Sequence, residues 1–153
     1  MTEPPYRPPT YQPPAGTGPS GPRANFGQRL GAWIVDLIPL AVVGGILYAI
    51  SRPLVYVAIL VGYAYFTYFE GSASGQTIGK KLLGIRVINF STGGRLGYLR
   101  AFGRELARIL SSFLCYLGYW WMLWDREKQT WHDKLATTVV VPESAYPVEH
   151  WPN

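Results

Sequence analysis

The sequence predicts an all-α integral membrane protein with a transmembrane helical hairpin, a third apolar segment and a small cytoplasmic β-hairpin or sheet. Two apolar runs carry this prediction: residues 31–50 hold 20 residues with one charge, and residues 53–69 hold 17 with none. At about 1.5 Å of rise per residue, these runs approach the roughly 30 Å of a bilayer's hydrocarbon core. A third run at residues 109–124 adds 16 residues. A soluble chain of 153 residues has little use for three such runs.

Proline divides the chain into a tail and a membrane domain. Residues 1–25 hold eight of the 13 prolines and almost nothing that a core can bury. We therefore expect this tail to stay disordered or extended. The membrane domain is expected at residues 26–142, followed by a short C-terminal tail at residues 143–153.

The first apolar run contains one charged residue, Asp36, close to a proline. An aspartate at the centre of a transmembrane helix costs about 2.5–3.5 kcal/mol, so Asp36 needs a partner. Pro39 removes a backbone hydrogen bond beside Asp36 and predicts a helix kink there. Arg29 shares the helix face of Asp36, but its side chain leans away from it, toward the headgroups. The partner of Asp36 should therefore come from another segment.

Charged residues ahead of the third apolar run are the candidate partners of Asp36. Arg104 and Arg108 are spaced i to i+4 and share one helix face, and Glu105 can complete a small network with them. Three roles of Asp36 stay open: a structural ion pair, a proton or cation site in transport, and binding of a lipid or partner subunit. An ionisable residue inside a membrane is a functional hypothesis by default.

The distribution of Lys and Arg predicts the orientation of the hairpin. The N-terminal tail and the basic loop at residues 70–100 lie on one side, whereas the turn on the other side holds only Arg52. Because positively charged flanks stay in the cytoplasm, we expect a multi-pass protein of the plasma (inner) membrane with a cytoplasmic N-terminus. The net charge of +5 then faces anionic headgroups rather than nucleic acid.

Two segments of the sequence favour short β-strands, one in the basic loop and one near the C-terminus. Residues 82–99 hold two runs on either side of a Ser-Thr-Gly-Gly turn, which predicts a β-hairpin. Residues 136–142 predict a further strand that ends at Pro142. This strand can pair with the hairpin only if both lie on the same side of the membrane.

The third apolar run has two alternative topologies. A simple span would export the C-terminal strand, whereas a re-entrant pair of short helices broken near Gly118 would return the chain to the cytoplasm. Basic residues after the run favour the re-entrant form, which we prefer. We expect an interfacial belt of aromatic side chains at Tyr119, Trp120, Trp121, Trp124 and Trp131.

Three cations of the loop, Lys80, Lys81 and Arg86, are candidate contacts for lipid phosphates. A phosphate-binding loop is excluded, because Ser74 stands where that motif requires glycine. With two histidines and one cysteine, widely separated, we expect no metal site, no cofactor and no enzymatic activity.

One further carboxylate, Asp133, follows the third apolar run. We expect it to pair with Arg29, Arg86 or Arg104 and so to tie the C-terminal region to the hairpin; a catalytic or gating role is the alternative. The neighbouring His132 is expected at the surface or the membrane interface.

Together these residues resemble the RDD family of small membrane proteins, named for one arginine and two aspartates. The matching positions are Arg29 before the first apolar run, Asp36 within it and Asp133 after the third. Residues 75–87, GQTIGKKLLGIRV, are similar to the family's G-x-T-x-G-K…G-x-R-V pattern, and the proline-rich tail resembles the actinobacterial proline-rich antigen type. The resemblance implies a membrane protein for which transport of unknown ligands is suggested, with cation/proton antiport for some members.

Three functions stay open from the sequence. The first is an accessory or assembly subunit of a larger membrane complex, because so small a chain has few internal contacts. The second is an oligomeric transporter or cation/proton antiporter that uses Asp36, since two spans alone cannot enclose a pathway. The third is a lipid-binding structural protein. The expected partners are anionic membrane lipids together with a membrane-protein complex or further copies of the chain.

Overall fold

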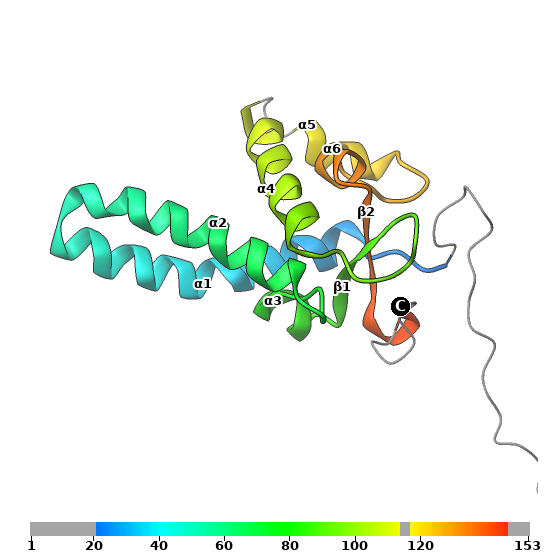
Figure 1. Cartoon of the computed structure of the whole chain (residues 1–153), viewed down its shortest axis with the longest axis horizontal. Helices are drawn as coiled ribbons and strands as arrows, with labels where there is room; N and C mark the ends of the chain where they lie inside the picture. Colours follow the sequence, from blue (N-terminus) through cyan, green and yellow to red (C-terminus); the bar gives the residue numbers. More distant parts are fainter. Residues whose placement is uncertain (1–20, 114–116, 147–153) are drawn as a thin grey trace, which may run out of the picture.

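The computed structural model describes residues 21–113 and 117–146, and the tail at residues 1–20 lies outside them. An antiparallel helical hairpin of α1 (Phe26–Ile50) and α2 (Val55–Gly71) extends from one side of the molecule (Figure 1). Its turn is the short helix η1 (Arg52–Leu54). Among the described residues, the helices at Phe26–Ile50 and Arg52–Gly71 are the two that are long and apolar enough to cross a membrane.

A capping box begins α1. The Asn25 side chain accepts a hydrogen bond from the Gln28 backbone N–H at 2.8 Å, and Gln28 Oε1 accepts one from the Asn25 N–H at 3.0 Å. Two backbone donors at the helix start are thereby satisfied. Pro39 lies inside α1, and the helix continues through it to Ile50, so the proline does not interrupt the first span.

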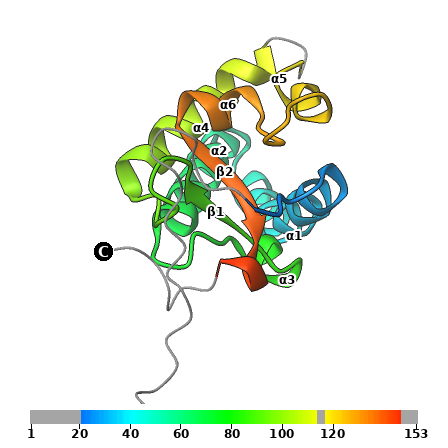
Figure 2. The same cartoon turned by 90° about the vertical axis from the view of Figure 1, so that its right-hand side faces the viewer.

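The other elements gather at the end of the hairpin opposite its turn (Figures 1 and 2). We call this part, residues 72–113 and 117–146, the cap. Its elements, in chain order, are α3 (Ile78–Leu82), β1 (Ile85–Asn89), α4 (Tyr98–Phe113), α5 (Leu117–Trp120), η2 (Trp121–Leu123), α6 (Trp131–Leu135), β2 (Thr138–Pro142) and η3 (Glu143–Ala145).

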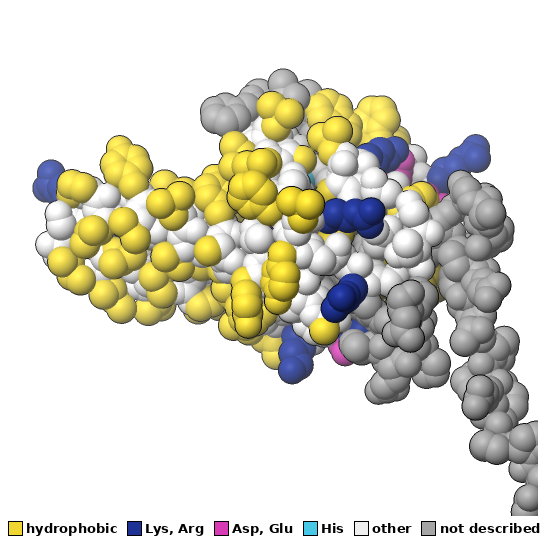
Figure 3. Space-filling view, in the orientation of Figure 1, with side chains coloured by type: hydrophobic (Ala, Val, Ile, Leu, Met, Phe, Trp, Pro, Cys, Tyr) yellow, Lys and Arg dark blue, Asp and Glu magenta, His cyan; other side chains and the backbone are white. Residues whose placement is uncertain are grey.

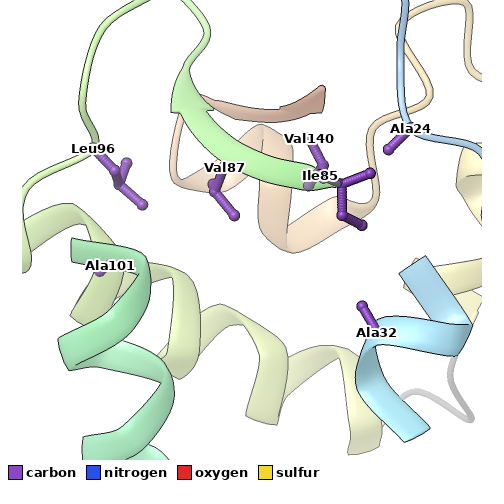
Figure 4. Packing of buried hydrophobic residues seen from close by; sticks show 7 residues of the cluster. All are labelled: Ala24, Ala32, Ile85, Val87, Leu96, Ala101 and Val140. Carbon is purple, nitrogen blue, oxygen red and sulfur yellow. The ribbon is translucent and has the colours of Figure 1, made fainter. Parts of the chain in front are cut away.

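A two-stranded antiparallel sheet of β1 and β2 lies at the centre of the cap, with Val87 opposite Val140. Side chains on both faces of the sheet are buried, which suits the uninterrupted apolar run in β2. One face packs against α1 and α4 (Figure 4). The buried cluster on this face consists of Ala24, Ala32, Ile85, Val87, Leu96, Ala101 and Val140.

The predicted β-hairpin is wrong in its second strand, because β1 pairs with β2 and not with the segment after the turn. Arg95 in that segment is exposed, and Gly97 has a left-handed φ of +79°, which an extended strand does not use. The valines of β2, by contrast, are fully or almost fully buried. The strand predicted at residues 136–142 is therefore the partner of β1.

Pairing of β1 with β2 also decides the path of the third apolar run. β1 precedes this run and β2 follows it, so the run begins and ends at the same end of the hairpin. The run divides among the end of α4, α5 and η2, with residues 114–116 outside the described part. The described parts of the run do not extend along the hairpin, and the chain returns to the end of the hairpin that it left.

Helix α4 lies across the end of the hairpin (Figure 1). It turns a charged side inward. Arg104 and Glu105 are buried, whereas Leu99, Phe102 and Leu110 are exposed. A water-soluble surface helix has the opposite arrangement. The outer face of α4 is therefore suited to an apolar environment.

Candidate functional site

Asp36 joins α1 to α3 and α2 inside the structure. Its Oδ2 accepts a hydrogen bond from Thr77 Oγ1 at 2.6 Å, and its Oδ1 accepts from the Gly79 N–H and the Tyr65 hydroxyl, both at 2.7 Å. The Tyr65 oxygen in turn accepts from the Ile78 N–H at 3.1 Å. The buried carboxylate thus holds the start of α3 in place.

The close contact at Asp36 depends on Gly79. A β-carbon at this position would lie 2.0 Å from the carbonyl oxygen of Ala32. Glycine therefore permits the backbone of α3 to reach α1, and Thr77 caps the helix at the same point by accepting from the Lys80 N–H. This packing explains why the sequence pattern at residues 75–87 has glycine at position 79.

The expected pairing of Asp36 with Arg104 or Arg108 is wrong, because both arginines bind other carboxylates. Arg104 and Lys80 contact Glu70 at the end of α2, and Arg108 Nη2 lies 3.1 Å from Glu70 Oε1. Glu70 is fully buried among these three cations. Sequence reasoning missed Glu70, although two cations on the inner face of α4 signal that a buried carboxylate must face them.

Asp133 connects α6 to both α1 and α4. Arg29 Nη1 lies 2.5 Å from Asp133 Oδ2, and Arg104 donates to Oδ1 from Nε at 3.0 Å and from Nη2 at 2.6 Å. Two of the three arginines expected as partners are thus present, and the third, Arg86, binds Glu143 at 2.7 Å. Burial favours the neutral acid, yet Arg29 and Arg104 hold the pKa of Asp133 well below its ordinary value.

Glu105 lies beside this network with one close cation, Arg108, at 2.9 Å. Burial raises the pKa of Glu105 to about 7, and the attraction of Arg108 opposes the rise. Glu105 is therefore the one carboxylate of the described network that changes charge near neutral pH.

Lys80 and Arg86 do not lie at the open surface of the loop, where contacts with lipid phosphates were expected. Both side chains are buried in ion pairs inside the protein, with Glu70 and Glu143 respectively. Lys81 is exposed and remains available to a headgroup. Burial also lowers the pKa of Lys80, against the attraction of Glu70.

His132 is buried, which differs from the expected surface position. Burial and the nearby arginines lower its pKa well below the ordinary value, against the attraction of Asp133, so the ring is neutral at pH 7. Its Nδ1 has no hydrogen-bond partner among the described residues. The Tyr119 ring packs beside it, with centroids 5.0 Å apart.

A cavity of about 290 Å³ lies between α1, α4 and the segment from α5 to α6. Its charged lining consists of Arg29, Lys80, Arg104, Arg108 and a single carboxylate, Asp36. Aromatic and aliphatic side chains form the remaining wall, where Phe26 stacks on Trp120 with centroids 5.8 Å apart. The residues expected in an aromatic belt divide accordingly: Trp120, Trp121 and Trp124 are exposed, and Tyr119 and Trp131 are half-buried.

The fold defines a mostly helical protein in which a cap with buried ion pairs closes one end of an apolar hairpin of membrane-spanning length. The chain belongs to the RDD family, whose sequence profile matches residues 23–137, and this membership indicates a small membrane protein. Arg29, Asp36 and Asp133, the residues that carried the resemblance, all lie at contacts between elements of the cap and the hairpin.

Three curated relatives are similar to parts of the chain. A proline-rich antigen homolog of Mycobacterium tuberculosis (strain CDC 1551 / Oshkosh) is 36% identical over 77 residues, 50% of this chain and 32% of the relative. The proline-rich antigen of Mycobacterium leprae (strain TN) is 35% identical over 88 residues, 56% of this chain and 35% of the relative. The uncharacterized protein YxaI of Bacillus subtilis (strain 168) is 34% identical over 89 residues, 58% of each chain.

The predicted resemblance to the RDD family and the proline-rich antigens is confirmed. The matched segments span about a third of the length of the mycobacterial relatives. No solved structure matches the chain.

Proposed function

We propose that this protein is a lipid-binding structural component of the plasma membrane, without enzymatic activity, and that its cap and N-terminus are cytoplasmic. The observation that carries the proposal is an exposed apolar surface that covers the hairpin and continues over α4 (Figure 3). Leu99 on α4 is 85% exposed, and Trp124 after η2 is 77% exposed. Exposure to water costs about 25 cal/mol per Å² of apolar surface, and contact with lipid removes that cost.

The position of α4 extends this surface beyond the two spans. Because its leucines face outward at the base of the hairpin, α4 is suited to lie in the membrane interface with Arg104 and Arg108 turned into the cap. The exposed tryptophans of α5 and η2 lie at the same end, where aromatic rings favour the headgroup level.

The proposed orientation rests on charge. The cap carries most of the described cations, whereas the hairpin turn carries Arg52 (Figure 3). In a Cys115→Ser background, a cysteine at the exposed position Ser144 should react with an impermeant thiol reagent only after the membrane is permeabilised. A cysteine at Ser51, in the turn, should react in intact cells. The reverse pattern would overturn the orientation.

Lipid binding is tested by purifying the full chain in mild detergent and measuring bound lipids by mass spectrometry. We expect phospholipid to stay bound after exchange into lipid-free detergent, because the apolar surface at the base is not part of a simple cylindrical span. Folded protein that keeps no lipid, and that alkaline carbonate releases from membranes, would overturn the proposal.

A second function, an assembly subunit of a membrane complex or homo-oligomer, is favoured by one observation on α1. Gly44 packs toward Ala58 within the hairpin, but Ala41 and Gly45 face outward, and a β-carbon at Gly45 would meet nothing within 4 Å. Small residues on an outer helix face permit another helix to approach closely. In the same purification, a stoichiometric partner or a defined multiple of the chain would support this function.

The transport alternative has less support. Asp36 accepts three hydrogen bonds that join α1 to α2 and α3, so its carboxylate already has a structural use. Moving a cation or proton through this position would break the contact that fixes α3.

A further inference from the structure

We propose that the cavity between α1, α4 and the α5–α6 segment binds the anionic phosphodiester headgroup of a membrane phospholipid, whose acyl chains leave toward the outer surface of α1. This inference rests on the proposed lipid-binding function and assigns it a specific site. Four features of the cavity carry it: the sign of its charges, its polar atoms without a protein partner, the burial gradient along its wall and its size.

The charges that line the cavity are mostly positive. Four cations line it, with Asp36 as the single carboxylate, while Glu70 and Asp133 lie outside the lining, behind the cations that they bind. Both oxygens of Asp36 accept hydrogen bonds, which reduces its repulsion of an anion. An anion in the cavity therefore meets guanidinium and ammonium groups first, and guanidinium forks suit phosphate oxygens.

Two residues of the cavity lining also carry a polar side-chain atom without a protein partner. Within the described part of the chain, Arg29 Nε and His132 Nδ1 are buried and have no hydrogen-bond partner. Arg29 uses its two other nitrogens for Asp133 and for the Lys128 carbonyl, so Nε is left over. Buried polar atoms are nearly always satisfied in native proteins, and a bound phosphate oxygen would satisfy the arginine.

The wall changes from buried and charged to exposed and apolar. Arg104 and His132 at the inner end are almost fully buried. Leu30, Trp33 and Trp120 at the other end are between 42% and 50% exposed. A cavity with cations inside and aromatic rings at its mouth matches an amphiphile that enters with its headgroup first.

The size of the cavity limits what it can hold. About 290 Å³ lies just below the roughly 300–1,000 Å³ of small-molecule sites. This space suits one headgroup and the first methylenes of its chains rather than a whole lipid, so the chains remain with the apolar surface outside.

The test measures the lipids bound to the detergent-purified full chain by native mass spectrometry. The probes are phosphatidylglycerol and phosphatidylcholine with identical acyl chains, and free glycerol phosphate serves as the competitor. We expect phosphatidylglycerol to bind about tenfold more tightly than phosphatidylcholine, and glycerol phosphate not to displace it, because it lacks the acyl chains.

Two variants with matched controls locate the site. Arg29→Lys keeps the charge opposite Asp133 but loses Nε, and it should reduce the preference for phosphatidylglycerol to below about threefold. Trp33→Ala removes part of the mouth and should reduce the retention of both lipids. Arg23→Lys makes the same change at an arginine outside the cavity lining and should keep the preference, and Ile34→Ala shortens an exposed neighbour on α1 and should keep the retention.

The outcomes separate the site from the general function. Equal retention of the two lipids in the parent, displacement by glycerol phosphate, or unchanged retention of both lipids in Trp33→Ala would overturn the headgroup site while leaving lipid binding intact. Loss of all lipid from the folded parent protein would overturn both. If Arg29→Lys does not fold, Trp33→Ala still decides, because Trp33 makes none of the ion pairs of the cap.

Discussion

Arg104 binds Asp133 through two hydrogen bonds to one carboxylate oxygen, from Nε at 3.0 Å and from Nη2 at 2.6 Å. Its remaining nitrogen, Nη1, contacts Glu70, so one buried guanidinium joins α4 to the end of α2 and to α6. Burial lowers the pKa of an arginine, but the two carboxylates reverse this effect and raise it, so Arg104 remains charged. The cap is therefore built around fixed charges rather than around a large apolar core.

Removing this central cation should destabilise the cap strongly. Arg104→Gln leaves Glu70 and Asp133 with fewer partners in a buried site, and breaking a buried ion pair costs about 3–5 kcal/mol. Thermal unfolding in detergent, followed by circular dichroism, measures the loss. Lys134→Gln is the matched control: its pair with Asp125 is at the surface and is worth about 0–1 kcal/mol. Equal losses in the two variants would contradict the central role of Arg104.

Asp36→Asn should loosen α3 without affecting the Glu70 network. The amide keeps one acceptor oxygen for the Gly79 N–H and the Tyr65 hydroxyl but loses the second oxygen, which accepts from Thr77. We expect a loss of about 1–3 kcal/mol and faster hydrogen exchange at residues 77–82. Adding Arg108→Gln should not restore stability, because Arg108 binds Glu70 and Glu105. A rescue would mean that Arg108 and Asp36 interact.

Gly79→Ala should be more damaging than its size suggests. The new methyl group would lie 2.0 Å from the Ala32 carbonyl oxygen, a backbone atom that cannot turn aside. We expect a loss at or above the about 1–3 kcal/mol typical of overpacking. Gly45→Ala is the control, because a β-carbon there meets nothing within 4 Å, and alanine favours a helix interior. Similar melting temperatures for the two variants would contradict the close packing of α3 on α1.

The elements that periodicity and apolar length describe were predictable from the sequence. The helical hairpin, the strand that became β1 and the strand at residues 136–142 follow from local patterns, as do two of the arginine partners of Asp133. The partner of β1 was not predictable locally, because a strand's own residues do not say which distant strand it pairs with. The nearer segment after the turn is the partner that local patterns predict for β1. Its Gly97 has a left-handed φ, so the segment does not continue as an extended strand.

The partners of Asp36 and the use of Glu70 escaped prediction for related reasons. One of the donors to Asp36 is a backbone N–H of Gly79, which every residue except proline has, so no side chain marks it in the sequence. Glu70 directly follows the second apolar run and looks like the ordinary polar end of a span. Only the arrangement of α2 against α4 turns it into the centre of a buried cluster.

The stability of the cap should respond to pH through Glu105. Because burial raises its pKa from 4.5 to about 7, the folded protein keeps this proton between those values while the unfolded chain releases it. The contribution of Glu105 to the free energy of unfolding is therefore greatest below about pH 4.5 and is lost as the pH rises through 7. His132 acts in the opposite sense, because its lowered pKa makes the fold less stable as the pH falls below 6.5.

A comparison of Glu105→Gln with the parent at each pH isolates the contribution of Glu105. The amide resembles the protonated acid, so the variant should gain stability relative to the parent from pH 4.5 to 7 and hold that gain above it. The gain should be on the order of 3 kcal/mol, at 1.36 kcal/mol per pKa unit. Arg108, Arg104, Glu70 and Lys80 face the same group and are unchanged in both proteins. A difference that does not vary with pH would contradict the raised pKa.

The outward leucines of α4 provide a test of whether that face contacts lipid. Leu106 is exposed, so in a water-facing helix Leu106→Glu would change stability by no more than about 0.5 kcal/mol. If the face lies in the membrane interface, the new glutamate replaces an apolar contact with lipid. Alkaline carbonate should then extract the protein more readily. Its bound lipid should decrease as well. Ser91→Glu introduces the same side chain at an exposed cap position after β1 and should leave extraction by carbonate unchanged. Equal behaviour of the two variants would mean that α4 faces water.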